Sequence, residues 1–87
     1  MPERLRRVIR EHQFERDLRA LSLSPKEADE FVEAAEFVLA RDPEIGLHIA
    51  PNSNVWVLPM APVGDLELSL YYTFDQSTVW LISIAPS

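Results

Sequence analysis

The longest stretch of regular hydrophobic spacing begins at Ser24. Apolar residues recur there every three or four positions, with acids on the opposite face; the stripe consists of Ala28, Phe31, Val32, Ala35, Val38 and Leu39. Ser24 is a suitable N-cap, because Pro25 occupies the first helical position and Glu27 follows three residues after the cap. Since Pro43 disfavours helical backbone at the residue before it, the spacing predicts a helix over Pro25–Arg41.

A second, shorter helical period precedes this helix. Phe14, Leu18 and Leu21 share one face, which predicts a helix over His12–Leu21 and an αα-hairpin with its successor. The segment Leu5–Arg10 fits either a continuation of this helix or a short strand. Periodicity over so few residues does not decide between them.

The second half of the chain changes to the two-residue period of strands. We expect strands over Val55–Leu58, Leu66–Phe74 and Thr78–Ala85, with turns at 51–54, 62–65 and 75–77. Alternation puts Tyr72 with the leucines of the core and Tyr71 on the more polar face. The pattern therefore predicts an α+β fold, in which a two-helix hairpin packs on one face of a three-stranded antiparallel meander.

Composition narrows the class of protein further. The 87 residues are 47% hydrophobic and contain no cysteine, which predicts one globular domain spanning residues 1–87 in a reducing compartment. The basic start lacks the apolar run of a signal peptide, and no stretch has the length of a membrane span, so we expect a cytoplasmic protein without membrane contact. The histidines and carboxylates are too scattered for a metal site, and we expect neither metal nor cofactor.

Charge is segregated along the chain. The net charge is −6, and all eight basic residues occur at or before Arg41; the residues are Arg4, Arg6, Arg7, Arg10, Arg16, Arg19, Lys26 and Arg41. Beyond Arg41 the charged residues are acids only, namely Asp42, Glu44, Asp65, Glu67 and Asp75. Because phosphates are bound by surplus positive charge, this distribution disfavours RNA or a ribosome as partner.

Aromatic and apolar residues of the strands are candidates for protein contact. Trp56 and Trp80 fit either a core or the anchors of an interface. The run around Leu81 is almost entirely apolar, which is typical of a central strand or of one covered by a partner. Tyr71 has two interpretations: a half-buried strand residue with its hydroxyl in water, or an aromatic platform on a binding face.

Three segments together resemble the RelE/ParE superfamily of toxin–antitoxin toxins. They are Arg7-Val8-Ile9 to Phe14-Glu15-Arg16-Asp17-Leu18, Glu33-Ala34-Ala35-Glu36-Phe37 to Arg41-Asp42-Pro43-Glu44-Ile45-Gly46, and Leu70-Tyr71-Tyr72-Thr73-Phe74-Asp75 to Trp80-Leu81-Ile82-Ser83-Ile84. The resemblance implies a short opening strand near Arg6–Arg10. It also implies a toxin-like component that binds a macromolecular target, of the ribosome–mRNA or gyrase type, and that pairs with an antitoxin.

Two departures bear on the family's chemistry. Its ribosome-dependent ribonucleases hold phosphate with basic residues on the sheet and move protons with a tyrosine or histidine. Here the strand position that usually carries arginine falls at or near Ser69, and the last strand ends in Ala85-Pro86-Ser87. These departures disfavour RNA cleavage and weigh less against gyrase-type binding. The catalytic residues are therefore unassigned, and the weak candidates are Tyr71, Arg16, Arg19 and His12. The alternative is a non-enzymatic protein-binding module that self-associates through its sheet.

Overall fold

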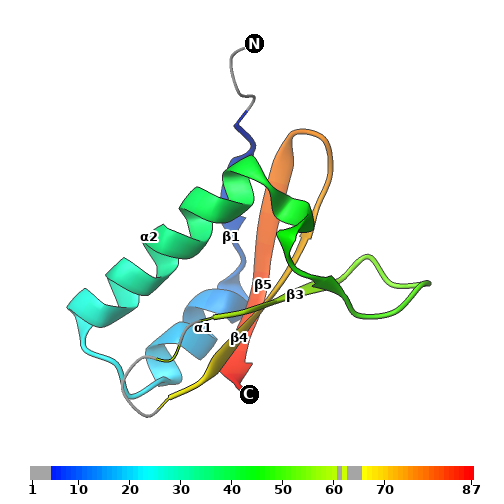
Figure 1. Cartoon of the computed structure of the whole chain (residues 1–87). Coiled ribbons are helices and arrows are strands. Elements are labelled where there is room, and N and C mark those ends of the chain that lie inside the picture. The colour runs from blue at the N-terminus through cyan, green and yellow to red at the C-terminus, as the bar shows by residue number, and fades with distance from the viewer. Residues whose placement is uncertain (1–4, 61, 63–65) are drawn as a thin grey trace.

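The computed structural model describes residues 5–60, 62 and 66–87. The elements follow in the order β1 (Arg7–Arg10), α1 (His12–Ala20), α2 (Pro25–Arg41), the 3-10 turn η1 (Pro43–Ile45), β2 (Leu47–His48), β3 (Trp56–Pro59), β4 (Leu68–Phe74) and β5 (Thr78–Pro86). Figure 1 shows both helices on one side of the strands.

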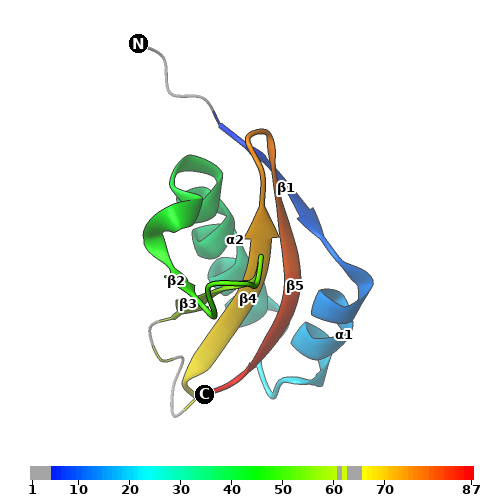
Figure 2. The same ribbon diagram turned by 90° about the vertical axis from the view of Figure 1, so that its right-hand side faces the viewer.

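The strands form one mixed sheet in the order β1-β5-β4-β3-β2. β1 runs parallel to β5, and the other neighbours are antiparallel. The α+β prediction is confirmed, including the short opening strand and the meander of β3, β4 and β5. Strand β2 was not predicted. We call the face that the helices cover the helix face, and the opposite one, toward the viewer in Figure 2, the open face.

Local sequence signals set the ends of α2. The Ser24 hydroxyl accepts the Glu27 N–H at 3.2 Å, and the Glu27 carboxylate accepts the Ser24 N–H at 3.1 Å, which completes a capping box. Asp42 leaves helical geometry immediately before Pro43. The helix therefore has the predicted bounds, while α1 ends one residue before the predicted Leu21.

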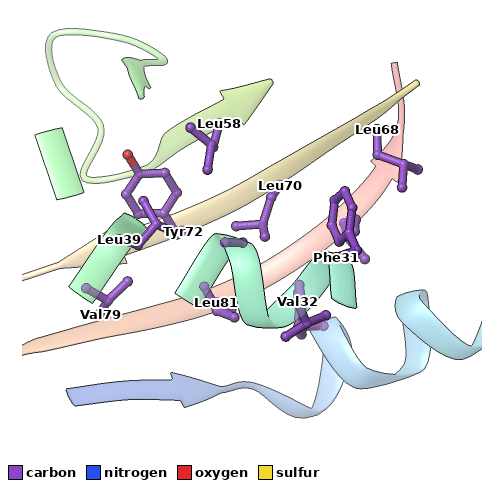
Figure 3. Packing of buried hydrophobic residues seen from close by; sticks show 12 residues of the cluster. Phe31, Val32, Leu39, Leu58, Leu68, Leu70, Tyr72, Val79 and Leu81 are labelled. Carbon is purple, nitrogen blue, oxygen red and sulfur yellow. The ribbon is translucent and has the colours of Figure 1, made fainter. Parts of the chain in front are cut away.

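The core lies between the helices and the helix face. Phe14 from α1 and Phe31, Val32, Ala35 and Leu39 from α2 pack against buried strand residues; these are Leu58, Leu68, Leu70, Tyr72, Val79, Leu81 and Ile84. Figure 3 shows several of these side chains meeting between α2 and the strands. Leu68, Leu70 and Tyr72 alternate along β4 and belong to this set, as the alternating sequence predicts, and Phe74 is partly buried against it.

Strand β5 departs from regular alternation at a bulge. Tyr72 pairs with Leu81 and Tyr71 with Ser83, so Ile82 has no cross-strand partner. The extra residue shifts the buried series from Val79 and Leu81 to Ile84. The bulge keeps both halves of a long strand facing the core.

Some predicted boundaries moved. The strand predicted from Leu66 begins at Leu68, and the strand predicted over Val55–Leu58 covers Trp56–Pro59. The last strand extends by one residue to Pro86. Of the predicted turn at 62–65, residues 63–65 lie outside the described residues.

Candidate protein-binding surface

The open face carries a row of aligned side chains across four strands. Leu47 is the Cα partner of Val57, Val57 that of Tyr71, and Tyr71 that of Ser83. On β5, Trp80 is the Cα partner of Ile9 in β1 and of Thr73 in β4. Val57, Tyr71 and Trp80 are half-buried and Leu47 is exposed. In the described part of the chain no helix crosses this face, so its apolar groups are available to a partner (Figure 2).

The second tryptophan lies on the helix face. Trp56 is the Cα partner of buried Tyr72. Its ring stacks on His48 with centroids 4.9 Å apart, and it meets the Phe74 ring at 5.3 Å. The guanidinium of Arg6 stands 5.8 Å from the Phe74 centroid and donates to the Asp75 carbonyl at 2.9 Å. Trp56 and Trp80 therefore point to opposite sides of the sheet and do not share one flat interface.

Leu81 was a candidate interface residue, and the structure corrects this. Its side chain is fully buried in the cluster between the helices and the sheet. Regular alternation places it beneath α2, whereas its neighbour Trp80 faces the other way. The apolar character of β5 thus reflects a strand that is covered on one face by the helices, and Leu81 offers no surface to a partner.

The four catalytic candidates are not assembled into a site. His12 begins α1, Arg16 and Arg19 are exposed along that helix, and Tyr71 is on β4. Helix α1 packs chiefly against β5. Among the described residues, no hydrogen bond or ion pair joins any two of these candidates. Their positions show no nucleophile, base or phosphate clamp held in mutual contact.

Arg10, by contrast, has an acidic partner on the helix side. Its Nη2 lies 3.1 Å from Glu36 Oε1, and its Nε lies 3.2 Å from Glu36 Oε2, a two-point contact. Hydrogen bonding to Glu36 raises the pKa of Arg10 above its ordinary value. This contact ties β1 to α2 and directs the guanidinium away from the open face.

Tyr72 fixes the turn that follows α2. Its buried hydroxyl donates to the Pro43 carbonyl and accepts the Gly46 N–H at 3.2 Å. Figure 3 shows the oxygen pointing out of the cluster of side chains. Burial raises the pKa of Tyr72 to about 12. Gly46 is required there, because a Cβ would overlap the tyrosine hydroxyl and lie 2.6 Å from the Val57 carbonyl. This hydroxyl has a structural task.

Asp17 covers the edge of β5 beyond the end of β1. Its carboxylate accepts the Ser83 hydroxyl, more weakly the Ile84 N–H at 3.4 Å, and the Gln13 amide at 2.6 Å. The hydrogen bond from Ser83 lowers the pKa of Asp17 below its ordinary value. The sequence reasoning missed this residue, since the contact joins positions 66 residues apart.

The segment around β2 was also missed. Ile45, Leu47 and Ile49 are 54%, 62% and 49% exposed. They alternate with Gly46 and His48, a two-residue period that could have revealed the strand. The segment forms an exposed apolar border beside the open face.

Other features of the described residues offer little chemistry. A hollow of about 320 Å³ between α1 and α2 is mostly apolar; its lining is Leu18, Arg19, Leu21, Leu23, Pro25, Ala28 and Asp29. The described residues contain no group of three or more His, Asp or Glu side chains that could hold a metal ion. Neither described helix has the length and hydropathy to span a membrane.

Comparison with known proteins gives the fold an independent reference. No family model and no curated protein matches the sequence. A crystal structure of the toxin–antitoxin complex RelBE2 from Mycobacterium tuberculosis contains a similar chain, with a TM-score of 0.71 and 23% sequence identity. The alignment covers 95% of this chain and 92% of that one. The described chain therefore has a RelE-like toxin fold, as the sequence resemblance implied.

Proposed function

We propose that this chain is the toxin-fold member of a toxin–antitoxin pair and that it acts by binding a macromolecule rather than by cleaving RNA. The observation that carries the proposal is the likeness to a chain of a toxin–antitoxin complex over 95% of this sequence. The antitoxin would be a protein that covers apolar surface left open here. The target would be of the ribosome or gyrase type.

The charge of the sheet argues for binding without RelE-type cleavage. Cleavage by a ribose hydroxyl builds negative charge on phosphate, which requires positioned cations and a proton donor. No Lys or Arg follows Arg41, so β3, β4 and β5 carry none. The hydroxyl-bearing residues Ser69, Tyr71 and Thr73 line the open-face side of β4 instead.

The nearby arginines do not replace the missing cations. Arg6 donates to the Asp75 carbonyl in the β4–β5 hairpin, and Arg10 is paired with Glu36 on the helix side. Arg16 and Arg19 remain as exposed cations on α1, and no described contact joins either of them to Tyr71. They are the residues to vary when cleavage is tested.

Expression in a bacterial host, with the full chain under inducible control, tests this proposal. We expect induction to arrest growth, co-expression of the cognate antitoxin to restore growth, and the two proteins to co-purify. Purified chain added to translating ribosomes should leave the mRNA intact. Growth that continues unchanged at high expression would contradict the toxin role. If the wild-type protein cleaves the mRNA and the Arg16→Ala or Arg19→Ala protein leaves it intact, the non-catalytic role would be contradicted.

A second candidate function is a non-enzymatic protein-binding module without toxicity. The exposed apolar segment formed by Ile45, Leu47 and Ile49 favours it, because such segments mark protein contacts. The same expression experiment separates the two functions. The module would leave growth unaffected and would still be recovered with a bound protein.

A further inference from the structure

The outer edge of β2 has unpaired backbone groups. β2 is the last strand of the sheet and is paired with β3 only. The Ile49 N–H donates to the Val55 carbonyl at 3.1 Å. Because successive residues of an antiparallel strand direct these groups to alternate sides, the His48 N–H and C=O point away from β3. No described segment supplies a strand there, and such an edge is a template for another chain.

The two edges of the sheet differ in how they are protected. β1 begins and ends with exposed arginines, Arg7 and Arg10, and charged edges discourage pairing. Asp17 also takes up the Ile84 N–H where β1 no longer covers β5. β2 has no charged residue, and Leu47 within it is 62% exposed. The edge that is left open is thus also the apolar one.

We propose that a second copy of this chain pairs antiparallel with β2 about a twofold axis at His48. Each His48 N–H donates to the His48 carbonyl of the other copy, which uses the groups that β3 leaves free. The Gly46 N–H keeps its bond to the Tyr72 hydroxyl. This register sets Leu47 opposite Ile49 of the second copy, at the closely spaced positions where aliphatic pairs contribute most.

The segment is compatible with its own copy in charge as well as in shape. A twofold contact places the same strand on both sides, so each residue must tolerate its mate. The paired segment, β2 together with Ile49, carries no acidic side chain, and Glu44 belongs to the 3-10 turn that precedes it. Acids therefore do not face acids, although each chain has a net charge of −6. A contact built on so short a strand is below the size of stable interfaces, so the dimer is a weak one.

Sedimentation equilibrium of the full chain over a wide concentration range tests this inference, which is independent of the proposed function. We expect a reversible monomer–dimer equilibrium. Leu47→Lys should raise the dissociation constant at least about tenfold, because the lysine faces an aliphatic pair and blocks the edge. Leu5→Lys is the matched control, since Leu5 is also exposed, at 55%, and lies outside β2; it should leave the equilibrium unchanged.

Two further measurements identify the surface used. Amide exchange at His48 should slow as the protein concentration rises, whereas Trp80→Ala on the open face should leave dimerisation intact. A wild-type chain that remains monomeric at about millimolar concentration would overturn the inference. So would a Leu47→Lys protein that dimerises like wild type, or a dimer that Trp80→Ala disrupts and in which His48 exchanges freely.

Discussion

Removing the hydroxyl of Tyr72 tests how the turn after α2 is attached to the sheet. The side chain is fully buried, and its hydroxyl is held between the Pro43 carbonyl and the Gly46 N–H. Tyr72→Phe keeps the ring and its packing and deletes one donor and one acceptor. The Pro43 carbonyl then loses its partner in a buried contact, and the Gly46 N–H loses its partner in a partly buried one. Tyr71→Phe is the matched control, because that hydroxyl makes no described hydrogen bond.

The magnitude follows from the two groups left without a partner. A buried polar group that loses its hydrogen bond costs about 1–3 kcal/mol. Because the Gly46 contact is only partly buried, we take the low end of this range for each of the two groups and expect Tyr72→Phe to lower the free energy of unfolding by about 2 kcal/mol. Urea unfolding followed by circular dichroism measures this, with an unchanged denaturant slope if the fold is preserved. Tyr71→Phe should change it by less than about 0.5 kcal/mol. Equal effects of the two substitutions would refute the reasoning.

The same hydroxyl gives a pH signature. The pKa of Tyr72 is raised from 10.0 to about 12, so the unfolded chain ionises before the folded one. The stabilisation is fully present below about pH 10 and is lost as the pH rises toward 12. The wild type should therefore lose on the order of 2 kcal/mol more than Tyr72→Phe over this interval. Parallel stability curves for the two proteins would contradict the assigned role.

Three other substitutions test separate parts of the fold by urea unfolding. Gly46→Ala should cost about 2 kcal/mol, because the added Cβ overlaps the Tyr72 hydroxyl; an unchanged midpoint would contradict that contact. Asp17→Ala should cost about 1–2 kcal/mol at neutral pH. Since the pKa of Asp17 is lowered, its contribution to the free energy of unfolding is present above about pH 4 and is lost as the pH falls through the folded pKa. The free energy of unfolding of the variant should therefore fall less steeply with decreasing pH than that of the wild type. Ser24→Ala should cost about 1 kcal/mol through loss of the capping box of α2, and no loss would mean that the cap is dispensable.

The predictable parts of this fold are those fixed by local sequence. The bounds of α2 follow from Ser24, Pro25 and the Asp-Pro pair at its end, and each signal acts within one turn of helix. The alternation of β4 likewise identified Tyr72 as buried. The sequence pattern did not predict strand β2, because this strand is two residues long and exists only through pairing with β3. A turn-like reading of Gly46 concealed the alternation of Ile45, Leu47 and Ile49.

The faces of the strands were harder to assign than the strands themselves. Trp56 and Trp80 belong to strands that do not pair with each other, so their sides depend on the register of each strand with β4. Leu81 was misassigned because an almost continuous apolar run gives no internal sign of which alternate residues are buried. The bulge at Ile82 then changes the alternation beyond it. These properties arise from contacts between distant segments.

The segregation of charge acquires a spatial meaning in the folded chain. Folding does not bring the early arginines to the open face; Arg6 and Arg10 are held on the helix side, where a carbonyl and a carboxylate bind them. The open face keeps Tyr71 and Trp80 among hydroxyl and aliphatic side chains. Such a surface binds through burial of apolar area, which responds weakly to salt, whereas phosphate binding weakens steeply. Partner binding through this face should therefore persist as salt is raised from about 50 to 200 mM, and a loss of about 1,000-fold would identify a phosphate-bearing partner instead.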